Sequence, residues 1–230
     1  TKNHIKFVAG PVQYFCEDNL INKFRTLEFF SLVSSGAAAI QLSNSTICNG
    51  ANLAFRTKEY NEIPLDVFED FNSDDISLLH YFKNYHKDAI CFSKDLDAVV
   101  ETNSNSDTLS QLNQKLRWIS NAKNEKDLYT FYVALVVFLM NFVFAVLLLL
   151  FLVSIFYRHQ ERYMVATSFF LVFFIKSITD YLFMKQVLGF FRRKDLLIYL
   201  FPFEIINAIY TVLIVPLSLF YSPKWKGRRL

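Results

Sequence analysis

Three long apolar stretches in the second half of the chain constrain its fold more than any other feature. They cover approximately residues 128–157, 163–190 and 196–221. Each exceeds the roughly 20 residues that an α-helix needs to cross ~30 Å of hydrocarbon. The chain is 53% hydrophobic and contains 26 Phe, far more than the core of a soluble domain of this size requires. The sequence therefore predicts a membrane protein with about three transmembrane helices.

A change in composition near Asp127 marks the main boundary of the chain. Up to Asp127 the sequence is typical of a mixed globular domain with a net charge of −4, and beyond it the net charge is +7. A basic membrane region suits anionic lipid headgroups, and it also suits a phosphorylated substrate held at the membrane surface. We therefore expect the lipid bilayer as a partner, and we expect no nucleic-acid partner.

Polar residues also occur inside the apolar stretches. Lys176 and Asp180 are four residues apart in the second stretch. Because burying either charge alone in lipid is costly, we expect an ion pair that faces the helix bundle. Pro202, Glu204 and Pro216 interrupt the third stretch, which predicts either a kinked span or two shorter pieces.

The side of the membrane on which each part lies is argued from basic residues and cysteines. The basic segments 192–194 and 224–229 both favour the cytosol. Three simple crossings from a cytosolic domain would place the second segment outside, whereas a re-entrant third stretch would place both inside.

Cys16, Cys48 and Cys91 form no C-x-x-C pair, so we expect neither a zinc site nor a disulfide framework. A reducing, cytosol-facing domain before the membrane stretches fits this cysteine usage.

An amphipathic helix is predicted just before the first apolar stretch, within residues 106–127. At 3.6 residues per turn, Gln114, Arg117 and Trp118 share one face. The opposite face carries Leu109, Leu112, Leu116 and Ile119. Such a helix can lie on a membrane surface with its leucines toward lipid. Two interpretations stay open: an anchor with Trp118 as an interfacial aromatic, or a floor for a sugar and a phosphate.

The first half of the chain contains two segments with ligand-binding character. Residues 5–9 predict a strand that stops at Gly10-Pro11. Further on, residues 46–56 predict a strand that begins at Thr46, then a loop that contains Gly50, and then a second short apolar element. Gly50 allows backbone to approach a ligand closely, and the amides of Asn49 and Asn52 can hydrogen-bond sugar hydroxyls. The Asn-Gly pair is also typical of an ordinary hairpin turn.

Acidic residues occur at two further places. Asp74 and Asp75 open a predicted helix, where the helix dipole and capping by Asn72 or Ser73 would favour them without any catalytic role. Asp95-Leu96-Asp97 resembles a metal-binding D-x-D, but it precedes a predicted strand at 98–100 and is typical of a solvated strand entry. His80 and His86 have no metal-ligand spacing with a carboxylate, so we interpret them as surface or packing residues.

Taken in order, these segments resemble the motifs of the membrane-bound family-2 glycosyltransferases, the group that contains cellulose and hyaluronan synthases. The resemblance rests on Gly10-Pro11, residues 48–56, Ser73-Asp74-Asp75 and residues 114–118, which precede the membrane helices. It covers most of the first 127 residues. It implies an α/β fold of the GT-A type, of which residues 1–105 would form the acceptor-side half, followed by the interfacial helix at 106–127 and the transmembrane region at 128–230.

The resemblance also implies roles for individual residues. Asp75 matches the general base of the family, and Asp74 is the neighbouring carboxylate that would tune it. Gln114, Arg117 and, less directly, Lys115 match the residues that neutralise the leaving diphosphate of the donor. The residues that would bind the acceptor are Trp118, Cys48, Asn49, Gly50 and Asn52.

The donor-binding half of a GT-A domain, with its uridine-binding Asp and metal-binding D-x-D, has no counterpart in this sequence. The cofactor implied by the resemblance is Mg²⁺ or Mn²⁺, with its ligands upstream and none in this chain. We therefore expect a longer polypeptide or a separate partner chain to supply that half. The expected function is inverting transfer of a sugar from a nucleotide-sugar donor to a saccharide or lipid acceptor, in polysaccharide or glycolipid synthesis. The alternative is a non-catalytic membrane subunit that serves as a scaffold.

Overall fold

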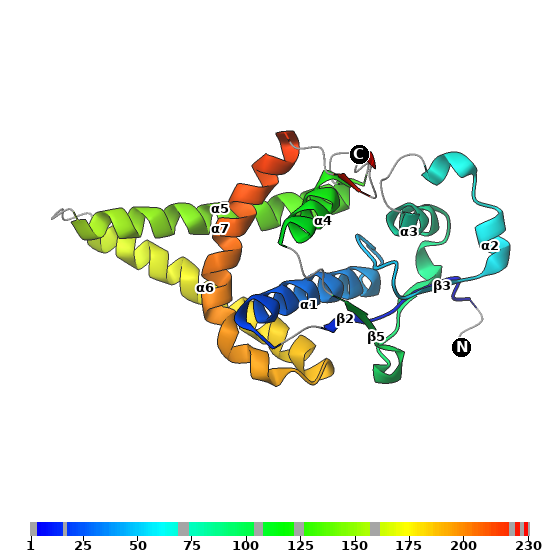
Figure 1. The fold of residues 1–230 in the computed structure, drawn as a ribbon, viewed down its shortest axis with the longest axis horizontal. Coiled ribbons are helices and arrows are strands. Elements are labelled where there is room, and N and C mark those ends of the chain that lie inside the picture. The colour runs from blue at the N-terminus through cyan, green and yellow to red at the C-terminus, as the bar shows by residue number, and fades with distance from the viewer. Residues whose placement is uncertain are drawn as a thin grey trace. The chain divides into compact units, whose positions relative to one another are not determined.

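The computed structural model describes residues 4–15, 18–68, 74–103, 108–121, 127–156, 162–220, 224–225 and 228–229. The chain divides into two compact units. The first consists of Thr1–Phe131 and Ser222–Leu230, and the second of Tyr132–Tyr221. The described chain is mostly helical, and its small sheets lie in the first unit (Figure 1).

The described strands of the first unit form three small sheets. Two of them consist of β1 (Phe7–Ala9), β2 (Val12–Phe15), β3 (Leu53–Phe55), β4 (Ile90–Phe92) and β5 (Val100–Asn103), and the third is an antiparallel pair of β6 (Lys224–Trp225) and β7 (Arg228–Arg229). One sheet has the order β3-β1-β4, in which β1 is antiparallel to β3 and parallel to β4. The second sheet pairs β2 with β5 in parallel. Gly10-Pro11 thus separates two consecutive strands that belong to different sheets.

The predicted strands are only partly confirmed. Of the strand expected at 5–9, residues 7–9 are present as β1, which ends before Gly10-Pro11 as expected. The strand expected to begin at Thr46 is wrong, because residues 46–48 form a loop with no regular structure. The expected strand at 98–100 is displaced: a short 3₁₀ helix, η3 (Leu96–Ala98), precedes β5.

The first unit also contains helices. They are α1 (Leu20–Gln41), α2 (Thr57–Asn61), α3 (Asp74–Tyr85) and α4 (Thr108–Asn121), with 3₁₀ helices η1 (Leu65–Phe68) and η2 (Lys87–Ala89). Asn19 caps α1 by accepting the N–H of Asn22 at 2.9 Å. Near the end of α1, Gly36 packs against the backbone of Ile47. A Cβ at Gly36 would lie 2.7 Å from the Ile47 oxygen.

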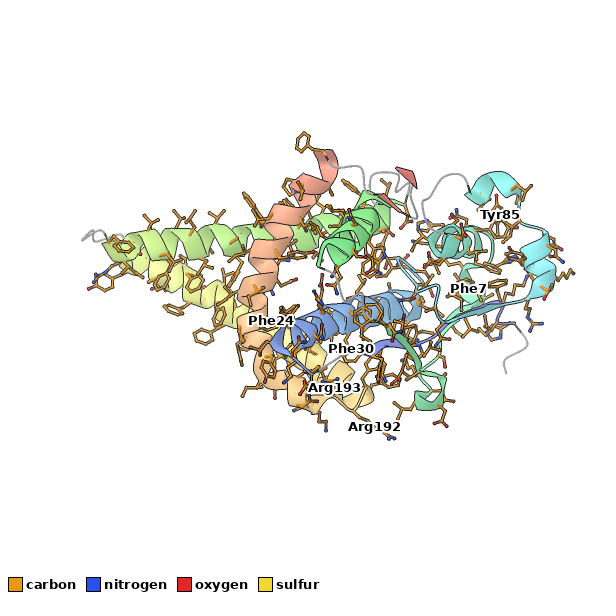
Figure 2. All side chains as sticks on the ribbon, in the orientation of Figure 1. Phe7, Phe24, Phe30, Tyr85, Arg192 and Arg193 are labelled. Atoms are coloured by element: carbon orange, nitrogen blue, oxygen red, sulfur yellow. The ribbon has the colours of Figure 1, made fainter. Side chains whose placement is uncertain are left out.

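The core of the first unit lies between α3 and the β3-β1-β4 sheet. Phe7 of β1 and Leu79 and Phe82 of α3 are fully buried in it. The rings of Phe7 and Phe82 are 5.2 Å apart. Figure 2 labels Phe7 together with Phe30 of α1, another fully buried aromatic side chain. This packing fixes the helix that carries Asp75 against the strand that leads to Gly10.

The second unit contains the three predicted apolar helices. They are α5 (Leu128–Phe156), which begins in the first unit, α6 (Arg162–Phe190), and α7 (Leu200–Phe220) after the 3₁₀ helix η5 (Lys194–Tyr199). All three are long and apolar enough to cross a membrane, with η5 and α7 counted as one span. The third stretch is not divided at its prolines. The 3₁₀ helix η5 ends at Tyr199, and α7 follows directly and continues through Pro216.

Aromatic packing joins the three helices of the second unit. Phe144 of α5, Phe169 of α6 and Ala208 of α7 form a buried cluster. The ring of Phe169 lies 5.7 Å from that of Phe144 and 5.0 Å from that of Phe151. Most of the remaining apolar side chains on α5 and α6 point outward and are exposed (Figure 2). This arrangement is consistent with a membrane protein, since lipid can cover such a surface.

Candidate functional site

The candidate site lies at the carboxyl edge of the parallel pair β1–β4. Ala9 and Phe92 are partners at the end of that pair, and Leu53 at the start of β3 pairs with the same Ala9. Residues just before β3 are therefore brought to the edge where β1 and β4 end. In open α/β sheets, ligands bind in the crevice outside the carboxyl ends of the strands. Gly10-Pro11 and the Cys48–Asn52 loop both lie at this edge.

Asn52 holds this edge together. Its amide nitrogen donates to the carbonyl oxygens of Pro11 at 2.9 Å and Ala98 at 2.7 Å. The backbone N–H of Gly10 also donates to the Asn52 carbonyl at 2.9 Å. Only glycine fits at position 10, because a Cβ there would lie 2.3 Å from the Asn52 amide nitrogen. The amide hydrogens of Asn52 are used within the fold, so in this conformation they position the loop instead of binding an acceptor.

Asp75 lies against the glycine of the same loop. Its Oδ2 accepts the backbone N–H of Gly50 at 2.8 Å, and its Oδ1 accepts the N–H of Ile76 at 3.0 Å. The predicted helix start is confirmed, with Asp74 and Asp75 in the first turn of α3. Asn72 and Ser73, the expected caps, are outside the described residues. The structure thus brings together two motifs that are 25 residues apart in the sequence.

Cys48 contacts the backbone of Asp75. Its thiol donates to the Asp75 carbonyl oxygen, with 3.3 Å between sulfur and oxygen. Burial, and to a smaller extent the nearby Asp75 carboxylate, raises the pKa of this thiol well above its usual value. Asn49 closes the loop, because its side-chain oxygen accepts the N–H of Ala51 at 3.0 Å. Cys48 is therefore a neutral thiol that fixes Asp75, and Asn49 shapes the turn that presents Gly50.

The residues of α4 have contacts of their own. Lys115 forms an ion pair with Glu28 of α1, and its ammonium lies 5.7 Å from the centre of the Trp118 ring. Leu116 is only 1% exposed, so the expected position of this leucine against lipid is wrong. Gln114 is half-buried, and the side chain of Arg117 is outside the described residues. No motif in the sequence indicated Glu28, since this residue lies far from all of them.

The Asp95-Leu96-Asp97 segment has a structural role. Asp95 caps η3 by accepting the N–H of Asp97 at 3.0 Å, which accounts for the first carboxylate of the D-x-D pattern. Within the residues that the structure describes, no group of three or more His, Cys, Asp or Glu side chains could hold a metal ion. Among the cysteines, Cys48 and Cys91 are not joined in disulfide bonds, and Cys16 lies outside the described residues.

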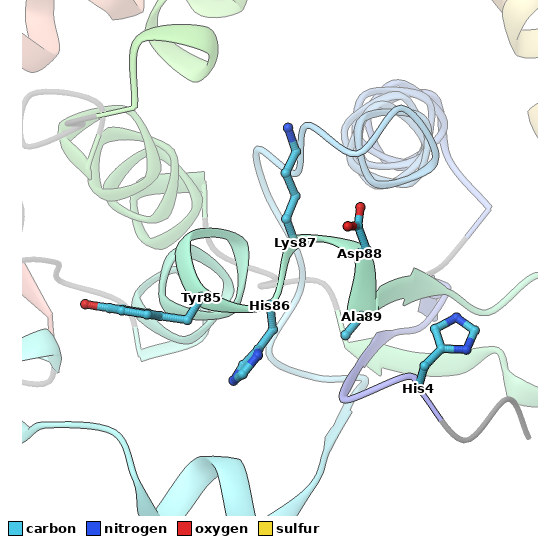
Figure 3. Close-up of a pocket in the computed structure, with 6 residues that line it drawn as sticks. All are labelled: His4, Tyr85, His86, Lys87, Asp88 and Ala89. Carbon is cyan, nitrogen blue, oxygen red and sulfur yellow. The ribbon is translucent and has the colours of Figure 1, made fainter.

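A hollow lies at the end of α3 opposite to Asp75. Figure 3 shows the six residues that line it: His4, Tyr85, His86, Lys87, Asp88 and Ala89. Its volume is about 240 Å³. Beside it, Lys6 contacts the His86 ring nitrogen at 3.3 Å and the Glu59 carboxylate at 3.1 Å. Asp75 and Tyr85 are ten residues apart on one helix, a separation of about 15 Å, so this hollow is distinct from the candidate site.

A comparison of the chain with protein families, with curated proteins and with solved structures gave no match. The functional argument therefore rests on the geometry of the Cys48–Asn52 loop and Asp75.

Proposed function

We propose that this chain forms the acceptor side of an inverting glycosyltransferase of family-2 type, which transfers a sugar from a nucleotide-sugar donor to a saccharide or lipid-linked acceptor at a membrane. The hydrogen bond between the Gly50 N–H and the Asp75 carboxylate is the observation that carries this proposal. It joins a glycine loop and a helix-start carboxylate at the carboxyl edge of two parallel strands. Structural capping alone would not require a loop 25 residues away to bind the same carboxylate.

The chemistry assigned to Asp75 is general-base catalysis. The acceptor hydroxyl attacks the anomeric carbon of the donor sugar as its proton passes to the Asp75 carboxylate. The bond between the anomeric carbon and the diphosphate oxygen breaks, and the nucleoside diphosphate leaves with the electron pair. Attack from the face opposite the leaving group inverts the anomeric configuration. The N–H groups of Gly50 and Ile76 hold the carboxylate in place during this step.

The residues of α4 complete the proposal. Arg117 and Gln114 are assigned to the leaving diphosphate, and Trp118 to the acceptor sugar. Lys115 is assigned a supporting role, because its ion pair with Glu28 and its position over Trp118 make it a positioning residue for that ring. Of the acceptor loop, Cys48, Asn49 and Asn52 position Gly50 and Asp75 through the contacts described above.

The donor and its Mg²⁺ or Mn²⁺ ion are assigned to the half of the GT-A domain that has no counterpart in this sequence. A divalent cation would supply neutralisation of the diphosphate charge. No step described for Asp75 depends on its coordination. The catalytic part is placed on the cytosolic face of the membrane, where nucleotide-sugar donors and a reducing environment are found.

The test is sugar transfer by the full-length protein in membranes. We expect incorporation of radiolabel from one of a panel of UDP- and GDP-hexoses into polymer or glycolipid. Asp75→Asn should abolish incorporation, since an amide cannot accept the proton, while membrane insertion stays normal. Asp97→Asn is the matched control, because it changes an exposed carboxylate that lies elsewhere in the same unit.

Each outcome of this test is informative. Transfer that survives Asp75→Asn would overturn the assignment of the base. Equal losses in Asp75→Asn and Asp97→Asn would attribute the effect to folding and would also contradict the proposal. Absence of transfer from every donor would favour the non-catalytic membrane subunit. The product distinguishes a processive synthase, which makes polymer, from an enzyme that adds one sugar to a lipid.

A further inference from the structure

The second unit contains a polar cluster between α6 and α7, within the segments that can span a membrane. Lys176, Ser177 and Asp180 belong to α6, and Glu204 belongs to α7. The ammonium of Lys176 lies 2.5 Å from the Asp180 carboxylate and 4.0 Å from Oε2 of Glu204. The expected pair of Lys176 and Asp180 is therefore confirmed, and it has a third charged neighbour.

Glu204 is the most deeply buried member of this cluster. Its side chain is 3% exposed, compared with 43% for Asp180. The hydroxyl of Ser177, itself 1% exposed, donates to Oε2 of Glu204 at 2.8 Å. The other carboxyl oxygen, Oε1, is buried and has no hydrogen-bond partner among the described residues. A buried ionised oxygen without a donor is unfavourable, whereas a protonated oxygen carries its own hydrogen.

The charges of the cluster lead to the same conclusion. If both carboxyl groups were ionised, one ammonium would face two carboxylates, and the cluster would carry a net negative charge within the membrane. Such a charge is costly in hydrocarbon, and binding one proton removes it. Asp180 already forms the close pair with Lys176, so the proton belongs on the buried partner.

We propose that Glu204 is a proton-binding site within the membrane unit and that Oε1 carries the proton at neutral pH. The site then consists of a neutral carboxyl group fixed by Ser177 beside the Lys176–Asp180 pair. Its role is to join α6 to α7 without a net charge in lipid. This inference does not depend on the proposed glycosyltransferase activity.

The other groups on the elements that pack against α7 are accounted for. On η5, Asp195 forms an ion pair with Arg193 at 3.1 Å, and Lys194 and Tyr199 are the remaining titratable residues. On α6, Tyr181 and Lys185 lie beyond Asp180 and contact one another, with the ammonium 5.9 Å from the ring centre. α5 has titratable residues only near its start, at Tyr129 and Tyr132. At the start of α6, Arg162 contacts the Tyr163 hydroxyl at 3.2 Å, and α7 itself carries Tyr210. Among the described charged side chains of these elements, Lys176 and Asp180 are therefore the two that lie next to Glu204.

The test is infrared spectroscopy of the full-length protein in lipid vesicles at neutral pH. We expect a carboxylic C=O band that shifts in D₂O and disappears in Glu204→Gln. Asp180→Asn should also remove it, because Lys176 then balances a single remaining carboxylate and Glu204 releases its proton. Asn141→Leu is the control, since it replaces a buried but non-titratable polar side chain on α5 and should leave the band unchanged.

Several results would overturn the proposal. These are the absence of the band in the wild-type protein, its persistence in Glu204→Gln, and a band that Na⁺ or K⁺ lowers at constant pH, which would identify a metal cation as the ligand. If the Glu204→Gln variant does not insert into the membrane, the Asp180→Asn variant serves as the test, because the Asp180 side chain is half-exposed. A band that stays at full intensity in Asp180→Asn would contradict the charge balance.

Discussion

The ammonium of Lys83 lies 2.6 Å from Oδ2 of Asp127 and joins the end of α3 to the start of α5. The same oxygen accepts the N–H of Thr130 at 2.9 Å and its hydroxyl at 2.7 Å. Asp127 therefore caps a long apolar helix and neutralises a lysine whose side chain is only 8% exposed. Since α3 also carries Asp75, contacts fix this helix near both of its ends.

Removing this contact should destabilise the first unit. Lys83→Met leaves the Asp127 carboxylate without its main cationic partner, and we expect a loss of about 2 kcal/mol in the free energy of unfolding. Denaturant titration in detergent measures it. Lys87→Met is the control, because Lys87 is exposed and lies 3.5 Å from Asn44. A similar loss in both variants would contradict a specific role for Lys83.

The stability should also depend on pH through Asp127. Burial raises the pKa of this carboxyl group, but the hydrogen bonds from Lys83 and Thr130 outweigh burial and hold it below its usual value. A lowered pKa means that the contribution is complete above the unfolded pKa of about 4 and is lost as the pH falls below it. The stability difference between wild type and Asp127→Asn should therefore be constant from about pH 5 to 8 and shrink in acid. A constant difference down to pH 2 would rule this out.

Cys48 should react slowly with alkylating reagents. The thiolate is the nucleophile, and the raised pKa keeps Cys48 in the thiol form at neutral pH. Asp75→Asn removes the charge that contributes to this shift, so alkylation of Cys48 should become faster. Mass spectrometry of iodoacetamide-treated protein measures the rate, with Asp97→Asn as the control. An unchanged rate in Asp75→Asn would contradict the contact independently of any enzymatic activity.

Two glycine substitutions should separate folding from function. At Gly10 a Cβ would lie 2.3 Å from the Asn52 amide nitrogen, which two hydrogen bonds fix, so Gly10→Ala should cost about 1–3 kcal/mol in stability. At Gly50 a Cβ would lie 3.1 Å from Oδ2 of Asp75, and a small shift accommodates it. Gly50→Ala should therefore fold and lose about tenfold in sugar transfer. Thermal unfolding and the transfer assay together distinguish the two.

Exchanging the charges of Lys115 and Glu28 should restore what each single change removes. The pair is partly exposed, so we expect a coupling of about 0.2–1 kcal/mol in a double-mutant cycle. Lys115→Glu should destabilise the contact between α4 and α1, and adding Glu28→Lys should recover most of the loss. A coupling of zero would mean that Lys115 is available to a ligand, contrary to the positioning role proposed here.

The sequence predicted the elements that have a long apolar stretch or a clear helix-start pattern. The three apolar helices need only hydrophobic length, and the start of α3 follows from two acidic residues in a first turn. The strand expected to begin at Thr46 was wrong. Thr46 and Ile47 are β-branched, which favours a strand, but here the Ile47 backbone packs against Gly36 of α1. Local propensity cannot distinguish this packing from strand pairing.

The candidate site could be predicted only as separate motifs. The family resemblance pointed to Gly50 and Asp75 as site residues, but the hydrogen bond between them depends on how α3 packs against β1. The use of the Asn52 amide by Pro11 and Ala98 depends on strand partners far away in the sequence. The partner of Lys115 could not be inferred either, since no local pattern connects α4 to Glu28. Such contacts join residues that are far apart in the sequence, so no short segment of the sequence predicts them.

The pairing of β1 with β4 has a consequence for biosynthesis. Phe7 pairs with Ile90, so roughly eighty residues are synthesised between β1 and its parallel partner. At typical elongation rates this takes about 4–16 s. β5, the partner of β2, ends at Asn103, and α5 begins at Leu128 shortly afterwards. Sheet closure and entry of the first apolar helix into the bilayer are therefore close in time. Slow translation between Asn103 and Leu128 should favour correct folding, because it lets these long-range strands pair before the membrane constrains the chain.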